Sequence, residues 1–161
     1  MAVTMQNADM KYQFADVTSD EDWLARHAIR RDVLWTARGR QNYDGRHADE
    51  YLRTNHPLLL KFEDRPVGTT RLDERGDGTG VVRLVAIREQ SQQQGHGRQL
   101  GLMVEARARQ LGLTTLYVNA VSNAAGFYRK TGWDDFSWDP TELTETFAVC
   151  IQMRKLLFTT T

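Results

Sequence analysis

Residues 92–98 combine glycines and polar side chains at a spacing that could bind a phosphate. They read Gln-Gln-Gln-Gly-His-Gly-Arg, and a helical pattern begins at once after them. Gly95 and Gly97 have no Cβ that would keep a ligand away from the backbone, so successive N–H groups can point at one place. The N-terminus of the helix adds its partial positive charge. The predicted chemistry is therefore the binding of a phosphate or pyrophosphate.

Two common phosphate-binding motifs do not fit this stretch. A dinucleotide fingerprint, Gly-x-Gly-x-x-Gly, needs a third glycine at position 100, which is Leu. A P-loop needs Gly-Lys followed by Ser or Thr, and that sequence is missing here. What remains is Gln-x-x-Gly-x-Gly over residues 92–97. A second segment, residues 123–133, follows it and reads Asn-Ala-Ala-Gly-Phe-Tyr-Arg-Lys-Thr-Gly-Trp.

Together the two segments resemble the acyl-CoA motifs of the GCN5-related N-acetyltransferase (GNAT) superfamily, closely over residues 58–138 and loosely elsewhere. The resemblance implies that acetyl-CoA binds through its pyrophosphate to the loop residues Gln92, Gln93, Gln94, Gly95, His96, Gly97 and Arg98. In this family the preceding strand splays from its neighbour, which would leave main-chain groups of Ala86 and Ile87 free for the pantetheine arm.

The second segment carries the other implied site residues. Asn123 would cap the next helix and contact the pantetheine arm, and Phe127 would pack against that arm or the core. Tyr128 matches the tyrosine that faces the thioester sulfur, so it is the predicted catalytic residue. The sequence departs from the family at Gln93, where glycine is usual. Glutamine is tolerated there unless φ must be positive, so the tightness of cofactor binding is in question, not binding itself.

The general base is left unassigned. A protonated amine must lose a proton before it can attack, usually to a carboxylate or through water. The candidates are Glu50, Glu63, Glu74, Glu89 and His47. Their spacing does not rank them.

Composition narrows the classes of partner. Lys plus Arg and Asp plus Glu number 21 each, so the net charge is zero and no strong nucleic-acid partner is expected. Six arginines between residues 26 and 46 could attract an acidic group, although a solvated face is the favoured interpretation. Four scattered histidines and one cysteine give no metal-ligand spacing, so no metal is expected.

The same composition predicts a cytoplasmic protein. No stretch approaches the roughly eighteen apolar residues of a membrane span, and the first ten residues lack the pattern of an export signal. Cys150 alone cannot form an intramolecular disulfide, which fits a reducing compartment. Its apolar neighbours predict a buried, inert thiol.

Periodicity predicts one domain over residues 11–157, preceded by a disordered stretch over residues 1–10. A strand is expected over 12–17, then a helix from about residue 19, with Thr18 and Glu21 as a capping box and Gly39 as its end. A short helix over 47–52 follows, and then three meander strands, 58–63, 67–73 and 81–87. After the loop come a helix from residue 97 to Gly112, a strand over 116–121, a helix over 123–130 and a strand over 146–153. The strands 81–87 and 116–121 should lie parallel in a β-α-β crossover.

The fold class expected is α/β (α+β), with a GNAT-like mixed, mostly antiparallel twisted sheet flanked by helices.

The resemblance implies an N-acyltransferase that moves an acyl group, in first place acetyl, from acetyl-CoA to a primary amine within a ternary complex. A small-molecule acceptor is expected, and a homodimer stays open. Two alternatives also stay open. One is acyl transfer from another donor, because residues 28–34 faintly resemble the acyl-homoserine-lactone synthases. The other is a catalytically silent acyl-CoA-binding sensor module.

Overall fold

The fold is seen in a computed structural model that describes residues 4–6, 11–40, 43–143 and 149–157. Within these residues one twisted sheet has the strand order β1-β2-β3-β4-β5-β6-β8-β7. The strands are β1 (Thr4–Gln6), β2 (Tyr12–Asp16), β3 (Asn55–Phe62), β4 (Arg65–Glu74), β5 (Thr79–Ile87), β6 (Thr115–Val121), β7 (Asp134–Asp135) and β8 (Cys150–Leu156). Of the neighbouring pairs, β5 and β6 are parallel and the others antiparallel.

Among the described residues, three α-helices and several short helical turns accompany the sheet. The helices are α1 (Asp20–Arg30), α2 (His96–Gln110) and α3 (Ala125–Lys130). The short turns are η1 (Arg31–Trp35), η2 (Thr36–Arg38), η3 (Ala48–Tyr51), η4 (Glu89–Ser91), η5 (Ser122–Ala124) and η6 (Pro140–Glu142). Because α2 connects the parallel strands β5 and β6, the predicted mixed sheet with a β-α-β crossover is confirmed.

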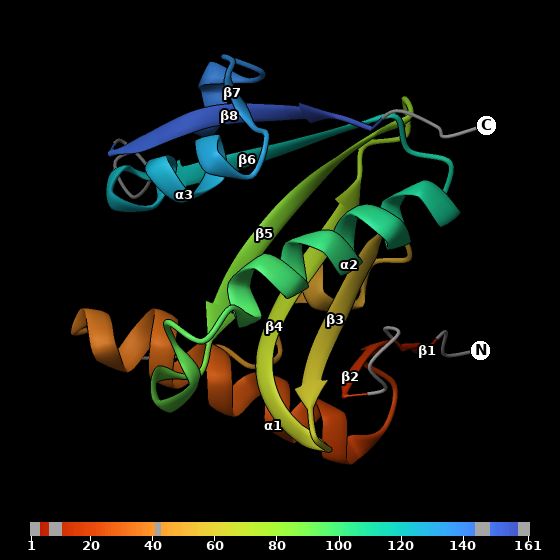
Figure 1. Ribbon diagram of the computed structural model, residues 1–161, viewed down its shortest axis with the longest axis vertical. Coiled ribbons are helices and arrows are strands. Elements are labelled where there is room, and N and C mark those ends of the chain that lie inside the picture. The colour runs from red at the N-terminus through yellow and green to blue at the C-terminus, as the bar shows by residue number, and fades with distance from the viewer. Residues whose placement is uncertain (1–3, 7–10, 41–42, 144–148, 158–161) are drawn as a thin grey trace.

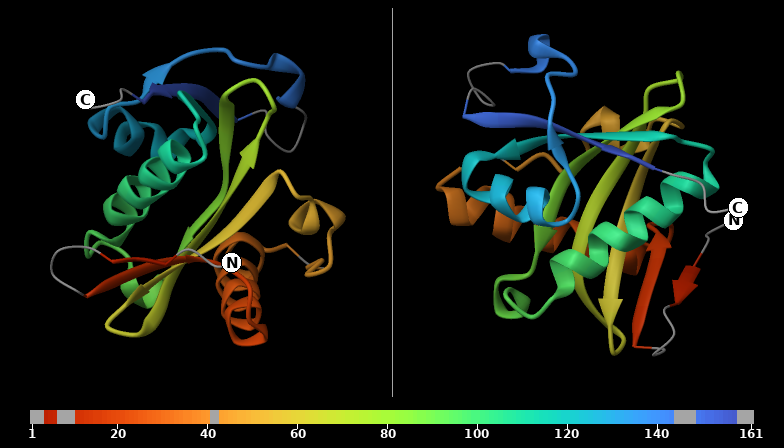
Figure 2. Two further views of the ribbon diagram at one scale, coloured as in Figure 1. Left: turned by 90° about the vertical axis from the view of Figure 1, so that its right-hand side faces the viewer. Right: turned by 45° about the horizontal axis from the view of Figure 1, so that its top comes forward.

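The helices cover opposite faces of the sheet, as Figures 1 and 2 show: α2 lies on one face and α1 on the other. The larger core lies under α2, where Leu100 and Val104 pack with strand residues such as Leu58. A smaller core lies under α1 and includes Ile29 and Leu59. The alternation of side chains along each strand therefore divides the sheet into an α2 face and an α1 face.

The first helix begins one residue later than predicted. Its N-cap is Ser19, whose hydroxyl accepts a hydrogen bond from the Asp22 N–H at 3.1 Å. The expected pair of Thr18 and Glu21 is thus wrong by one position, because the overlapping Ser-x-x-Asp pattern caps equally well. Helical turns continue through η1 and η2 to Gly39, whose φ of +69° ends them as predicted.

The two ends of the chain differ in detail from the sequence prediction. Thr4–Gln6, inside the stretch expected to be disordered, pairs with β2 as strand β1. The last strand runs over Cys150–Leu156, later than the predicted 146–153, and residues 146–148 lie outside the described part of the chain. Cys150 opens this strand half-buried, and burial raises the pKa of its thiol.

Candidate active site

The sheet opens into a fork between β5 and β6. Their parallel ladder joins Thr79–Val82 to Thr115–Val118 and goes no further. Beyond this point β5 pairs with β4 and β6 pairs with β8. Figure 1 shows the two strands diverging from their shared end at the upper right. The family resemblance implied this splay. In the described part of the chain, it leaves one edge of each strand without a neighbouring strand.

A β-bulge in β5 decides which side chains face the fork. Thr69 of β4 pairs with Ala86 and Arg71 pairs with Arg83, so β5 contains one residue more than β4 between these two pairs. Leu84 lies at this point with φ +56°, a left-handed conformation that costs a non-glycine residue about 1–2 kcal/mol. The extra residue puts Val85 on the same face as Val82, three positions earlier, so both line one pocket.

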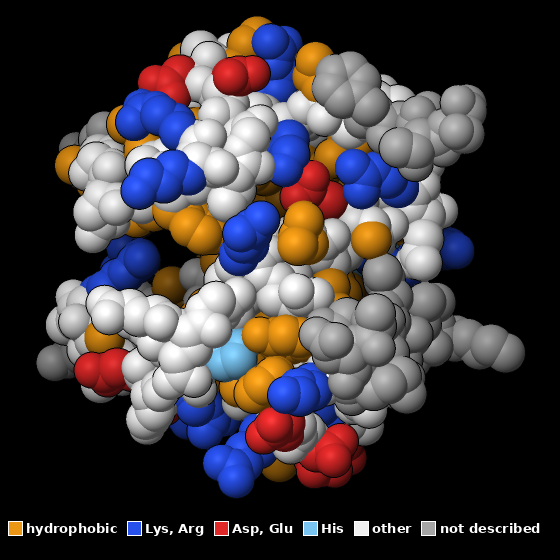
Figure 3. Space-filling view, viewed as in Figure 1, with side chains coloured by type: hydrophobic (Ala, Val, Ile, Leu, Met, Phe, Trp, Pro, Cys, Tyr) orange, Lys and Arg blue, Asp and Glu red, His pale blue; other side chains and the backbone are white. Residues whose placement is uncertain are grey.

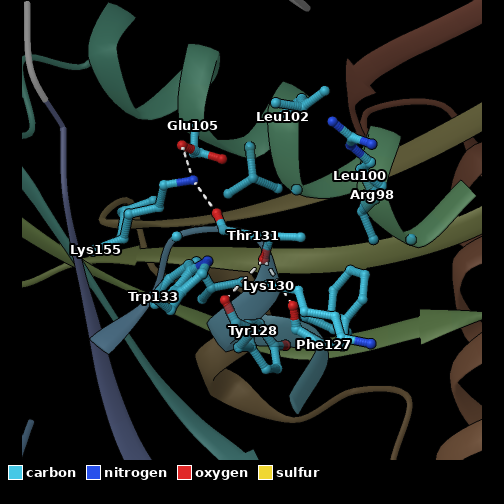
Figure 4. A pocket seen from close by; sticks show the side chains of 17 residues that line it. Arg98, Leu100, Leu102, Glu105, Phe127, Tyr128, Lys130, Thr131, Trp133 and Lys155 are labelled. Atoms are coloured by element: carbon cyan, nitrogen blue, oxygen red, sulfur yellow. Dashed lines mark hydrogen bonds and ion pairs between the residues drawn. The ribbon is translucent and has the colours of Figure 1, made fainter. Parts of the chain in front are cut away.

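That pocket, which we call the fork pocket, has a volume of about 590 Å³ and lies between α2 and α3. Its apolar lining includes Val82, Val85, Leu100, Val104 and Leu116. Figure 3 shows the surface hollowed between α3 and the start of α2. In Figure 4 side chains of α2 face the rings of α3 across the space. Small-molecule and cofactor sites have volumes of about 300–1,000 Å³, so the fork pocket is large enough for such a ligand.

The turn that leads into α2 has the geometry of a backbone anion site. Gly95 is the N-cap of the helix with φ +86°, which explains the need for glycine at that position. Gly97 lines the fork pocket, and a Cβ there would lie 3.7 Å from Cζ of Phe127, an ordinary contact. The protein itself therefore does not require glycine at position 97, whereas a ligand seated on the turn would.

Gln93 has a positive φ, the one backbone conformation in which glutamine is unfavourable at this position. Its φ is +62°, in the left-handed region that favours glycine. The side chain is exposed and forms no hydrogen bond with the described residues. The departure from the family pattern at this position therefore strains the loop without any visible compensation.

The glutamine side chains of the loop bond to nearby carbonyls. Gln92 Nε2 donates to the Ile87 carbonyl at 3.0 Å, and Gln94 Nε2 donates to the Gln90 carbonyl at 3.2 Å. The Ile87 carbonyl, which the resemblance assigned to the pantetheine arm, thus already accepts one bond and keeps one lone pair. Ala86 is buried in the core beneath α1. Neither strand residue contributes a side chain to the fork pocket.

His96 points away from the loop into the protein. Its side chain is 3% exposed, and its Nδ1 lies 2.7 Å from the Tyr12 hydroxyl. The ring also contacts Phe62, with centroids 4.9 Å apart. Burial lowers the pKa of the imidazole. His96 could thus contribute only its backbone N–H to a phosphate, while its ring ties the first turn of α2 to β2 and β3.

Tyr128 lies in the wall of the fork pocket. Its ring packs edge-on against Trp133, with centroids 5.5 Å apart. The hydroxyl makes no hydrogen bond to any other residue that the structure describes, so it is available to a ligand. Burial raises the pKa of Tyr128 to about 12. The phenol is therefore a hydrogen-bond donor at neutral pH and a very weak acid.

The structure treats two neighbours of Tyr128 in the motif differently. Phe127, which was expected against the pantetheine arm or in the core, is 43% exposed and lines the pocket beside Gly97. Asn123 is exposed in η5 and makes no capping hydrogen bond, because α3 starts after Ala124. The predicted cap at Asn123 is wrong, since η5 already leads the chain into the helix. Asn123 also does not line the pocket.

The sequence did not reveal the polar wall at the other end of the pocket. Lys155 of β8 pairs with Glu105 of α2 at 2.9 Å and donates to the Thr131 carbonyl at 2.6 Å (Figure 4). This lysine connects α2 to the end of α3 and so fixes their separation. Two further cations line the pocket, Arg98 and Lys130, and neither pairs with a carboxylate among the described residues.

The α1 face carries a network of arginines and carboxylates that begins at Glu50. Glu50 is 2% exposed and receives bonds from three arginines, Arg26, Arg30 and Arg71. Burial alone would raise the pKa of this carboxyl, but these guanidinium groups outweigh burial and lower it to about 2. Glu50 is therefore a structural anion and a poor general base. Arg26 and Arg30 are buried here and cannot serve the acidic-ligand surface that the sequence suggested.

The other candidate bases lie outside the fork pocket as well. Glu74 pairs with His56 at 2.7 Å, beside the start of β5. Glu63 lies in the turn between β3 and β4, and Glu89 lies in η4. His47 is exposed and accepts from the Asp49 N–H at 3.2 Å. Geometry thus gives none of them the role of base.

In the part of the chain that the structure describes, no group of three or more His, Cys, Asp or Glu side chains could hold a metal ion. None of the helices there is both long and apolar enough to cross a membrane.

Comparison with known proteins identifies the family. The profile of the acetyltransferase (GNAT) domain matches residues 40–157. The chain belongs to the GNAT family. The match covers both the fork and the loop before α2, so the resemblance noticed in two short motifs extends to most of the chain. Among curated proteins, none matches significantly.

Solved structures of GNAT proteins share the fold. A protein from Lactobacillus plantarum, assigned as an N-acetyltransferase, matches with a TM-score of 0.76 and 24% identity, over 92% of this chain and 99% of that one. An acyl-CoA N-acyltransferase from Pseudomonas aeruginosa matches at 0.72 and 19% identity, over 96% and 98%. N-acetylglutamate synthase from Neisseria gonorrhoeae, in complex with coenzyme A and L-arginine, matches at 0.69 and 16% identity, over 92% of this chain and 34% of that one. At sequence identities below 25%, this similarity shows a shared fold and nothing more.

Proposed function

We propose that this GNAT protein transfers an acetyl group from acetyl-CoA to the primary amine of a small molecule. The observation that carries the proposal is the fork pocket. Gly97 of the turn before α2 lines it, and its wall holds the Tyr128 hydroxyl, which has no hydrogen-bond partner among the described residues. A ligand that suits both ends carries a phosphate at one end and a hydrogen-bond acceptor, such as a thioester, at the other. Coenzyme A has this composition, and one solved GNAT relative was crystallised with it.

The pocket residues suit the two ends of this cofactor. The pyrophosphate would accept bonds from N–H groups at the start of α2, where the helix dipole favours negative charge. Arg98 and Lys130 line the same pocket, pair with no carboxylate in the described part of the chain and would neutralise phosphate charge. The pantetheine arm would follow the open edge of β5 past Val85, towards Tyr128.

In the proposed reaction the amine attacks the thioester directly. A C–N bond forms at the carbonyl carbon, the C–S bond breaks, and the electron pair returns to sulfur as a thiolate. The protonated amine gives one proton to water before it attacks and a second as the amide forms, because the carboxylate in the pocket lining, Glu105, is already paired with Lys155. Acyl transfer without a covalent enzyme intermediate fits a pocket whose 17 lining residues contain no Ser or Cys.

The role of Tyr128 is limited by its acidity. A phenol with a pKa of about 12 would give its proton to a thiolate with a pKa of about 8.5 at a cost of about 5 kcal/mol. Full proton transfer is thus unfavourable. A hydrogen bond that strengthens as charge develops on sulfur has no such cost and stabilises the transition state. Tyr128 would therefore act as a hydrogen-bond donor to the leaving sulfur.

One observation favours a second candidate, a CoA-binding module without turnover. None of the five candidate bases lines the fork pocket, so the pocket could hold an acyl-CoA without activating an amine. A cytoplasmic location, a small acceptor and a homodimer stay predictions.

Thiol release separates the two candidates. The protein would be incubated with acetyl-CoA and a panel of amino acids, polyamines, aminoglycosides and peptide N-termini, and free coenzyme A would be titrated with a disulfide reagent. Amine-dependent release supports transfer, and a small-molecule amine should be the best acceptor. Tight CoA binding in calorimetry with no release from any amine would favour the sensor module. Release only with longer acyl-CoA donors would contradict acetyl transfer.

A further inference from the structure

The fork between β5 and β6 is bridged by one carboxylate on the α1 face. Val82 and Val118 form the last pair of the parallel ladder. The next residues along each strand are Arg83 and Asn119, which the ladder no longer joins. Glu142 of η6 lies between their side chains. Its Oε1 accepts from Arg83 at 2.8 Å and from Asn119 at 3.1 Å, and its Oε2 accepts from Arg83 at 2.9 Å.

The Arg83 side of this bridge is anchored within the sheet. Arg83 Nε donates to Asp73 of β4 at 3.0 Å. Asp73 in turn receives two bonds from Arg71, at 2.7 and 2.9 Å. Arg71 also binds Glu50, so the guanidinium of Arg83 is held at the end of the buried network described above. It cannot turn away from the fork without breaking these bonds.

The Asn119 side is anchored equally. Asn119 Oδ1 accepts from Gln152 Nε2 at 2.9 Å. Gln152 is buried and also bonds to the backbone of Trp138 and Asp139, which begin the segment that carries Glu142. The Trp138 indole donates to the Val118 carbonyl at 3.1 Å, at the last rung of the ladder. Because the side chains of Arg83 and Asn119 are both held in place, the Glu142 carboxylate between them sets the distance between the two strands.

We propose that Glu142 is a positioning residue that fixes how far β5 and β6 part, and thereby the width of the site for the pantetheine arm and thioester. The inference rests on the proposed function for its consequence, because a cofactor arm must lie along the fork. Glu142 itself lies on the α1 face, opposite the side chains of Val82 and Val85 that line the pocket. It braces the site without lining it.

Glu142→Gln tests this bridge between Arg83 and Asn119, which we call the Glu142 brace, with almost no change in side-chain size. One end of the amide is an NH₂ group, which would oppose an N–H donor of Arg83 or Asn119. The matched control is Asp135→Asn, because Asp135 accepts two bonds from Arg129, at 3.0 and 2.9 Å, on the surface outside the pocket. Asn119→Ala removes the side chain that holds Glu142 from β6, and it is a second variant in case Glu142→Gln fails to fold.

The first readout is amide hydrogen exchange without ligand, which does not depend on the proposed function. Exchange over residues 83–87 and 119–121 should rise at least fivefold in Glu142→Gln and in Asn119→Ala, and should not change in Asp135→Asn. Unchanged exchange in the folded variants would overturn the brace, even if the protein is an acetyltransferase.

The second readout separates the arm from the nucleotide. Affinity for coenzyme A should fall at least fivefold in Glu142→Gln, while affinity for adenosine 3′,5′-bisphosphate, which lacks the arm, should stay within twofold. Altered exchange with unchanged CoA affinity would overturn the positioning role. The shape of the pH–rate profile should not change; loss of its acidic limb would make Glu142 a base instead. If the parent protein binds no coenzyme A at all, the proposed function is wrong. The exchange result still decides whether Glu142 fixes the separation of β5 and β6.

Discussion

The hydroxyl of Tyr12 lies 2.7 Å from Nδ1 of His96 and ties strand β2 to the first turn of α2. This bond joins two residues 84 positions apart at the helix end that is expected to hold phosphate. Because burial lowers the pKa of His96, the folded state holds the ring neutral at pH values where the unfolded chain has begun to protonate it.

The first prediction concerns pH. Above the unfolded pKa of about 6.5, a histidine whose pKa is lowered in the folded state does not change the free energy of unfolding. Below that pH it reduces the free energy of unfolding, because the unfolded chain binds the proton more readily. His96→Gln can still bond to Tyr12 but cannot titrate. The slope of unfolding free energy between pH 6.5 and 5 should therefore become shallower, by at most about 1.4 kcal/mol per pH unit. Urea denaturation at several pH values measures it, and an unchanged slope would show that His96 does not titrate differently on folding.

The second prediction concerns the anion turn. Gly97→Val adds a branched side chain where the pyrophosphate should sit. Affinity for coenzyme A should drop at least tenfold, about 1.4 kcal/mol. Calorimetry would be compared with Gly126→Ala, an exposed α3 position where a Cβ meets no atom within 4 Å. If a folded Gly97→Val protein binds coenzyme A as the parent does, the phosphate lies elsewhere.

The third prediction concerns the strained glutamine. Gln93→Gly removes a left-handed non-glycine residue, and the relief should exceed the entropy gained by the unfolded chain. The unfolding free energy should rise by about 0.5–1 kcal/mol. Gln92→Gly is the matched control and should lower it, because Gln92 has φ −70° and donates to the Ile87 carbonyl. Equal changes in the two variants would mean that φ at position 93 is not the cause.

The fourth prediction concerns the buried anion. Glu50→Gln leaves three buried arginines without their shared charge and should cost about 3 kcal/mol or more at pH 7. The control Asp32→Asn, at an exposed pair 3.9 Å apart, should change stability by less than about 0.5 kcal/mol. The pKa of Glu50 is lowered from 4.5 to about 2, so its contribution is present above pH 4.5 and is lost as pH falls towards 2. Acid denaturation of the variant should lose less stability over that range, and a parallel loss would contradict the assignment.

The parts of the fold that the sequence predicted rest on local patterns. The apolar run of β5, the glycines before α2 and the periodicity of that helix are each visible within about fifteen residues. The same holds for Gly39, whose conformation ends a helix without any distant partner. The family resemblance added the splay of the fork, which no local pattern contains.

The parts that the sequence missed depend on contacts between distant segments. Glu50 reads as a free carboxylate until α1 and β4 bring arginines to it, and Glu142 sits in a polar stretch that carries no motif. The ring of His96 looked like part of the phosphate loop, yet it turns inward because the partners from β2 and β3 lie behind α2. The bulge at Leu84 is hidden in an apolar run, because a register shift leaves no mark on composition.

The central claim, acyl transfer with the thioester beside Tyr128, is tested most directly by single-turnover kinetics of Tyr128→Phe. The substitution keeps the ring and its contact with Trp133 and removes only the hydroxyl. With the best amine of the panel, the rate of the chemical step should fall by about 10² or more, and the dissociation constant of acetyl-CoA should stay within a few-fold of the parent. The parent rate should show no alkaline limb from Tyr128 below about pH 11, because its pKa is about 12. A folded Tyr128→Phe protein that transfers the acetyl group at the parental rate would contradict the account and give the role at sulfur to water or to another residue.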